Sequence, residues 1–118
     1  MNLTINNKAY EMKFGLDFIN HLDKKYYFEQ DGIKIGQGLT YVVVQIELGN
    51  PLILVDLITA ATATGTKPKV EDIKAFIEAE ADIEGLMSEF LTALESTPIT
   101  RFTMKKLELL SDSEKSKK

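Results

Sequence analysis

The fold of this chain is decided by the stretch Leu3-Thr4-Ile5-Asn6-Asn7-Lys8-Ala9-Tyr10-Glu11-Met12-Lys13-Phe14-Gly15. Apolar and polar residues alternate on both sides of Asn6-Asn7, which predicts two strands that each have one apolar face. Asparagine tolerates a positive φ, so this pair suits the tight turn of a hairpin. The two-residue period stops at Gly15 and a helical period begins. We therefore expect a β-hairpin over residues 2–14 that leads directly into a helix.

Apolar residues at helical spacing continue through most of the remaining chain. They predict five helices, over residues 16–26, 39–48, 51–64, 70–81 and 83–95. The second helix contains Tyr41-Val42-Val43-Val44, a largely β-branched run that also suits a buried strand, but Gly49 at its end and the i, i+3, i+4, i+7 spacing favour a helix. The third is apolar on almost every side, so we expect it at the centre. Tyr27 to Gly38 is expected to be a connection, with a brief extended piece at Ile33 and Ile35.

These elements predict an α+β protein that is mainly α. We expect a single globular domain over residues 1–95, in which the hairpin is followed by a compact bundle of about four to five helices. Residues 96–118 are expected to form a flexible C-terminal segment, because its charged end from Ser111 onward has nothing to bury. Within that segment, the stretch from Ile99 to Leu110 stays open, since its apolar residues either pack on the domain or wait for a partner.

The net charge of −4 is unevenly distributed. Residues 1–69 hold seven basic and seven acidic residues, residues 70–95 hold eight acidic residues against Lys74 alone, and residues 96–118 hold six basic and three acidic ones. An acidic body disfavours nucleic-acid binding, which needs a basic face to neutralise phosphates. No stretch has the roughly 18 apolar residues of a membrane-spanning helix. We therefore expect a protein with neither nucleic acid nor membrane as a partner, which is intracellular or carries no mark of its compartment.

Reactive chemistry has few candidates in this sequence. The absence of cysteine excludes disulfides, thiol nucleophiles and cysteine zinc sites. The single histidine, His21, follows Asp17 by four residues, but zinc sites normally take at least three protein ligands. The glycine-rich segment 32–38 lacks the Gly-Lys-Ser/Thr ending of a P-loop and indicates turns. The acidic residues of 70–95 indicate a solvated helix face or a docking surface for a basic partner. We expect no enzyme, no metal and no cofactor.

Apolar residues are the remaining candidates for function. The stripe from Ile83 to Leu94 has the most regular helical spacing in the chain, and we expect it to be mostly core, with part of it open to a helical partner. Adaptable methionine is well suited to such a contact. The predicted partner-binding residues are Met87, Phe90, Leu94, Phe102, Met104 and Leu107.

A series of short motifs, taken in order, carries a family resemblance. They are the hairpin Leu3-Thr4-Ile5-Asn6-Asn7-Lys8-Ala9-Tyr10-Glu11-Met12-Lys13-Phe14, the helix Phe18-Ile19-Asn20-His21-Leu22-Asp23-Lys24-Lys25-Tyr26, then Gly38-Leu39, Gly49-Asn50-Pro51, Leu57-Ile58-Thr59-Ala60-Ala61-Thr62 and the acidic helix pair that runs to Glu95. Over most of residues 1–95 the chain resembles the tail assembly chaperones of long-tailed bacteriophages, or prophages, of Gram-positive bacteria. The order of the motifs gives this resemblance its specificity, because none of them is a chemical signature.

The resemblance implies a non-catalytic chaperone that coats the tape-measure protein, keeps its apolar helices soluble and helps to recruit tail-tube proteins. It further implies that the protein acts in the host cytoplasm and is absent from the mature virion. Self-association into a homo-oligomer is expected of such a scaffold. Two alternatives stay open: a tail or head-completion component that is retained in the virion, and a small regulatory protein-binding module.

Overall fold

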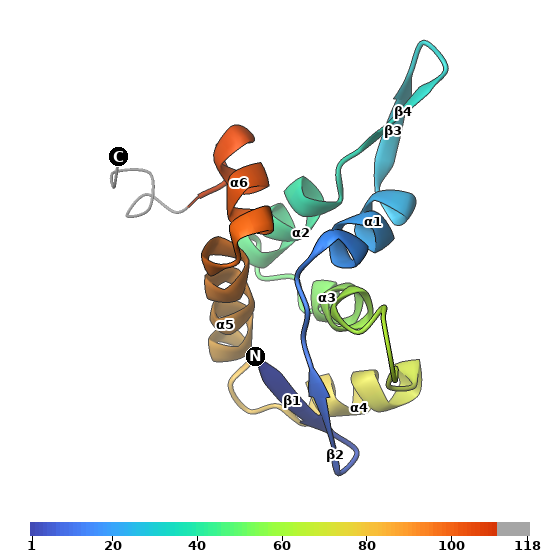
Figure 1. Ribbon diagram of the computed structural model, residues 1–118. Coiled ribbons are helices and arrows are strands. Elements are labelled where there is room, and N and C mark those ends of the chain that lie inside the picture. Colours follow the sequence, from blue (N-terminus) through green and yellow to red (C-terminus); the bar gives the residue numbers. More distant parts are fainter. Residues whose placement is uncertain (111–118) are drawn as a thin grey trace.

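The structure is a computed structural model that describes residues 1–110, and the disorder expected from Ser111 onward falls outside these residues (Figure 1). Within the described part, two hairpins and six helices follow one another along the chain. They are β1 (Asn2–Ile5), β2 (Lys8–Glu11), α1 (Leu16–Lys25), β3 (Tyr27–Gln30), β4 (Ile33–Gly36), α2 (Gly38–Glu47), α3 (Ile53–Ala61), α4 (Val70–Ala79), α5 (Ile83–Ser96) and α6 (Pro98–Lys106). The prediction of a mainly α protein with an N-terminal hairpin is confirmed.

The N-terminal hairpin forms as the alternation of residues predicts. β1 and β2 pair antiparallel, and the turn residues Asn6 and Asn7 have φ angles of 50° and 63°. Ile5 on the apolar face is fully buried. Directly after β2, the backbone N–H of Lys13 donates to the carbonyl of Ala61 at 2.9 Å. The hairpin is thereby tied to the end of α3.

The five predicted helices are confirmed, and the main difference in their bounds is at α3, which is shorter than expected at both ends. Asn50-Pro51 does start the turn, since the side-chain Oδ1 of Asn50 accepts from the N–H of Leu52 at 3.2 Å. Regular helix begins only after this turn. At the other end, the hydroxyl of Thr62 donates to the carbonyl of Ile58 at 2.7 Å. Threonine favours such local bonds, which compete with continued helix.

The core is built around α3. This helix packs against α1, α2 and α4, and Leu54, Leu57 and Ile58 on it are fully buried. The expectation that an all-apolar helix lies at the centre is therefore confirmed. On the other side of the core, Phe90 of α5 meets Phe14 edge to face, with the ring centroids 6.0 Å apart.

The expectation of a flexible segment from residue 96 is wrong for residues 98–106, which form the helix α6. Pro98 lies in its first turn, where the fixed φ of proline suits a helix. Thr100 and Met104 are fully buried, and α6 packs against α5 and α2. The hydroxyl of Thr100 donates to the carbonyl of Leu94 at 2.6 Å, which satisfies this buried polar group. A threonine in the buried face interrupts the apolar stripe and so hides the helix in the sequence.

The expected connection from Tyr27 to Gly38 contains a second hairpin. β3 and β4 pair antiparallel with Phe28 opposite Ile35, and the turn residues Asp31 and Gly32 have φ angles of 53° and 79°. All residues of both strands are exposed, and the hairpin projects away from the helices (Figure 1). The predicted extended piece is therefore one half of this ribbon.

Glycine is required where this second hairpin returns to the helices. A Cβ atom at Gly38 would lie 2.4 Å from the Cβ of Leu22, and one at Gly36 would lie 2.3 Å from the Cγ of Asp23. The N–H of Gly38 also donates to Oδ1 of Asp23 at 2.9 Å. The glycines at the end of this segment thus allow α2 to begin in contact with α1.

We expect the substitution Gly38→Ala to lower the free energy of unfolding by about 1 to 3 kcal/mol, because the new methyl group overlaps the buried Leu22 on α1. Urea denaturation measures the change. Gly15→Ala is the matched control, since nothing lies within 4 Å of a Cβ at that position. Equal losses in the two variants would contradict the packing argument.

Candidate partner-binding surfaces

The structure divides the six predicted partner-binding residues into two groups. Four of them are buried core residues: Met87, Phe90, Leu94 and Met104. Their side chains hold α5 and α6 in the bundle, so a partner reaches them only if the bundle opens. Phe102 on α6 is 63% exposed, and Leu107, directly after the end of α6, is 49% exposed. Of the predicted set, these two lie on the surface.

An exposed apolar stripe on α2 is a candidate that the residue pattern did not single out. Tyr41, Val44 and Leu48 are spaced by three and four residues, so they share one face of the helix. All three are exposed, and Leu48 is 72% accessible to solvent. The opposite face of α2 is buried in the core. The sequence contains one indication of this stripe, because residues 39–48 hold more apolar side chains than one buried helix face needs.

A hollow of about 360 Å³ lies beside this stripe, where α1 ends and β3 begins. Tyr26, Tyr41 and Val44 are among the residues that line it. The rings of Tyr26 and Tyr41 stack with their centroids 3.8 Å apart and an angle of 14° between their planes. Two stacked aromatic rings and an aliphatic side chain give the hollow an apolar wall suited to the apolar face of a helix.

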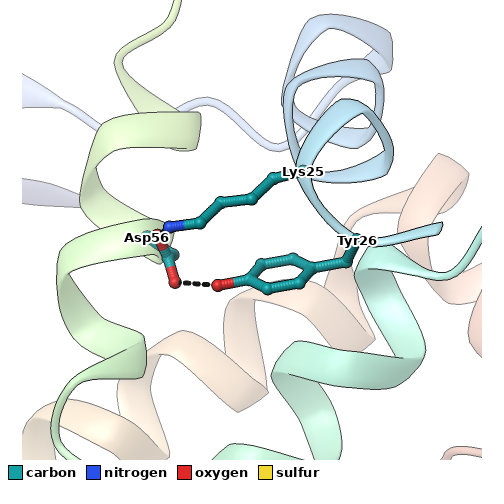
Figure 2. Close-up of polar contacts among 3 residues, drawn as sticks. All are labelled: Lys25, Tyr26 and Asp56. Carbon is teal, nitrogen blue, oxygen red and sulfur yellow. Dashed lines mark hydrogen bonds and ion pairs between the residues drawn. The ribbon is translucent and has the colours of Figure 1, made fainter.

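A polar contact to α3 fixes the position of Tyr26 (Figure 2). Its hydroxyl donates a hydrogen bond to the carboxylate of Asp56, and Nζ of Lys25 lies 2.6 Å from Oδ1 of the same carboxylate. The Asp56 side chain is only 19% exposed and belongs to a helix whose other residues are uncharged. A largely buried carboxylate needs hydrogen-bond donors, and Tyr26 and Lys25 supply them to Asp56. The same contact holds the ring of Tyr26 in the wall of the hollow.

Burial raises the pKa of Tyr26 above its ordinary value of about 10, and the bond to Asp56 acts in the same direction. The hydrogen bond requires a protonated phenol, and the nearby negative charge of Asp56 opposes a tyrosinate. The hydroxyl of Tyr26 therefore stays protonated and serves as a hydrogen-bond donor.

A second hollow, of about 550 Å³, forms a groove between α3 and α4. We call it the α3–α4 groove; it is lined by Pro51, Leu52, Val55, Lys74, Ile77, Glu78, Glu80 and Ile83. Its lining is mainly apolar. Leu52 in this lining is 72% exposed, and no other large apolar side chain of the described residues is more exposed. The charged residues of the lining are Lys74, Glu78 and Glu80. Such a groove suits an amphipathic helix.

Within residues 1–110 no three histidine or acidic side chains come together to hold a metal ion. Asp17 is exposed and His21 is half-buried, and they stand as a pair on α1. Among the described helices none is long and apolar enough to cross a membrane.

We expect Tyr26→Phe to lower the free energy of unfolding by about 1 to 2 kcal/mol, because it removes a hydrogen bond to a largely buried carboxylate. Lys25→Ala is the matched control at the same carboxylate. Its loss should be under about 1 kcal/mol, because the lysine side chain is 57% exposed and solvent screens the ion pair. A larger loss for Lys25→Ala than for Tyr26→Phe would reverse this ranking.

The same contact predicts a pH dependence. Since the pKa of Tyr26 is higher in the folded than in the unfolded state, its contribution to stability is complete below about pH 10 and declines as the pH rises above that. Urea denaturation at several pH values between about 8.5 and 11.5 measures this decline. Tyr26→Phe should lack this component, so the difference in stability between the two proteins should shrink with rising pH. A constant difference would contradict the assignment.

The chain matches a protein-family model over nearly all of its described residues. A family model described as phage tail assembly chaperone protein, TAC, matches residues 2–108. The match includes both hairpins and all six helices, α6 among them. No curated protein and no solved structure matches the chain. The family model spans far more than half of the sequence, so this chain belongs to the phage tail assembly chaperone family.

Proposed function

We propose that this protein binds the tape-measure protein during phage tail assembly and keeps its apolar helices soluble, without catalysing a reaction. The observation that carries the proposal is the α2 stripe, in which Val44 and Leu48 are 40% and 72% exposed and Tyr41, stacked on Tyr26, is 37% exposed. Monomeric proteins rarely leave such contiguous apolar surface open without a binding role. A helix of the tape-measure protein would lie along this stripe and against the Tyr26–Tyr41 wall.

Recruitment of tail-tube proteins would use a different part of the molecule. The hairpin of β3 and β4 projects from the bundle and presents Phe28, Ile33 and Ile35 on one face, all of them exposed. An isolated two-stranded ribbon is marginally stable in water, and its two outer edges carry unpaired backbone groups. Strand addition by a partner would satisfy such an edge. This separation lets one copy hold both partners.

Three further features complete the proposal. The protein acts in the host cytoplasm, it leaves before the virion is finished, and copies of it associate with one another. These follow from a role in assembly: a reversible coat on a long protein has to be shed once tail subunits replace it. A tail component retained in the particle would differ in the second of these features.

Co-expression with the tape-measure protein tests the main claim. We expect the wild-type chain to move the tape-measure protein from the pellet to the soluble fraction of the lysate. The double substitution Val44→Ser, Leu48→Ser should reduce the rescued fraction several-fold, because it removes the apolar stripe. Glu47→Ser is the matched control on the same helix and should rescue fully. An unchanged pellet with the wild-type chain would refute the proposal.

Analysis of purified virions tests the role in assembly separately. Mass spectrometry of intact particles should detect the tail-tube protein but not this chain. Its presence at a fixed ratio to the tail-tube protein would show that it is a structural component, even if the co-expression result holds.

A further inference from the structure

The outer face of α6 is a further exposed apolar surface among residues 1–110. Ile99 and Phe102 are exposed on α6, and Leu107 follows at its end. Lys105 and Lys106 are exposed beside them and pair with no carboxylate among residues 1–110. Nζ of Lys106 lies 5.7 Å from the centroid of the Phe102 ring. The face thus combines apolar side chains with closely placed positive charge.

The α3–α4 groove has the complementary character. Val55, Ile77 and Ile83 contribute apolar lining. The lining also holds two acidic residues, Glu78 and Glu80, and one lysine, Lys74. Five of the groove's eight lining residues come from the part of the chain, residues 70–95, that holds eight acidic residues and one lysine. A basic amphipathic helix is the occupant that this lining and this charge would recognise.

The α6 of the same molecule does not fill this groove. Ile83, at the groove, begins α5, and α6 begins directly after α5 ends. The 14 residues of α5 make a rod of about 21 Å that separates the two. Thr100 and Met104 also bind α6 to α5 and α2. Figure 1 shows α6 at the end of α5 that is remote from α4.

From these observations we infer that the α3–α4 groove receives the outer face of α6 from a second copy of this chain. Phe102 of one copy enters the apolar groove of the next, and Lys105 and Lys106 approach Glu78 and Glu80. The inference rests on the proposed self-association and names the surfaces that produce it. It is separate from the α2 stripe, which stays free for the tape-measure protein.

This contact joins two different surfaces, so it is head to tail. An open row keeps one free groove at one end and one free α6 at the other, so it either closes into a ring or grows as an open helix. A growing row suits a protein that has to cover a long partner. Because α6 has only nine residues, the contact is smaller than the roughly 800 Å² per partner of a standard interface. Association should therefore be weak, salt-sensitive and dependent on protein concentration.

Charge reversal on both sides of the contact provides the test. One variant carries Lys105→Glu and Lys106→Glu, and the other carries Glu78→Lys and Glu80→Lys. Sedimentation velocity over roughly two decades of protein concentration measures association. We expect the wild-type chain to associate and each variant alone to bind itself at least about tenfold more weakly, because like charges then face one another. An equimolar mixture of the two variants should regain association, since opposite charges meet again at every contact.

Two controls accompany this experiment. Lys24→Glu with Lys67→Glu makes the same change in net charge at exposed sites away from both surfaces and should associate like the wild type. Phe102→Ser should weaken association, whereas Leu16→Ser, at another highly exposed position, should not. Circular dichroism confirms that each variant is folded.

Several outcomes would overturn the inference. They are a wild-type chain that stays monomeric, charge reversals that leave association unchanged, and a mixture that fails to regain it. Loss of tape-measure rescue in Glu78→Lys, Glu80→Lys with association intact would assign the groove to the tape-measure protein instead. The co-expression assay on the wild-type chain decides the proposed function independently, so either idea can fail while the other stands.

Discussion

The structure depends on the burial of one helix, α3, which is apolar on nearly every side. Such a helix has to be covered all round, and α1, α2 and α4 supply the cover. The single charged residue of α3, Asp56, is largely buried there, so its carboxylate needs hydrogen-bond donors. Tyr26 and Lys25 provide them from the end of α1. The same bond positions the Tyr26 ring against Tyr41, so the stability of the core and the shape of the outer surface are linked.

Covering α3 also determines which surfaces remain for partners. The regular apolar stripe of α5 lies in the core, where Met87, Phe90 and Leu94 are buried. These side chains are therefore not accessible to another protein while the bundle is closed. α2 and α6 each bury one face and leave apolar residues on the other. A protein whose open surfaces are apolar helix faces is suited to holding other helices. The family to which the chain belongs is therefore consistent with where its surplus apolar side chains lie.

Much of the fold was predictable because its signals are local. The turn at Asn6-Asn7 and the regular apolar stripes of the helices each depend on residues only a few positions apart. α6 was harder to predict, since Thr100 on its buried face interrupts the apolar stripe and is satisfied by the carbonyl of Leu94 on the preceding helix. The binding surfaces were hardest of all. Residue patterns show that α2 is apolar on both sides, but only the packed fold decides that Val43 is inside and Val44 outside.

Hydrogen–deuterium exchange of this protein, with and without a soluble helical segment of the tape-measure protein, shows which face the helix contacts. We expect slower exchange of the amides in α2 and in the turn that follows it, residues 38–52, and unchanged exchange in α5. Binding to an outer face would leave the core as it is. Slower exchange confined to α5, or faster exchange there as the bundle opens around Phe90, would show that the chaperone works with its core residues and would contradict the account.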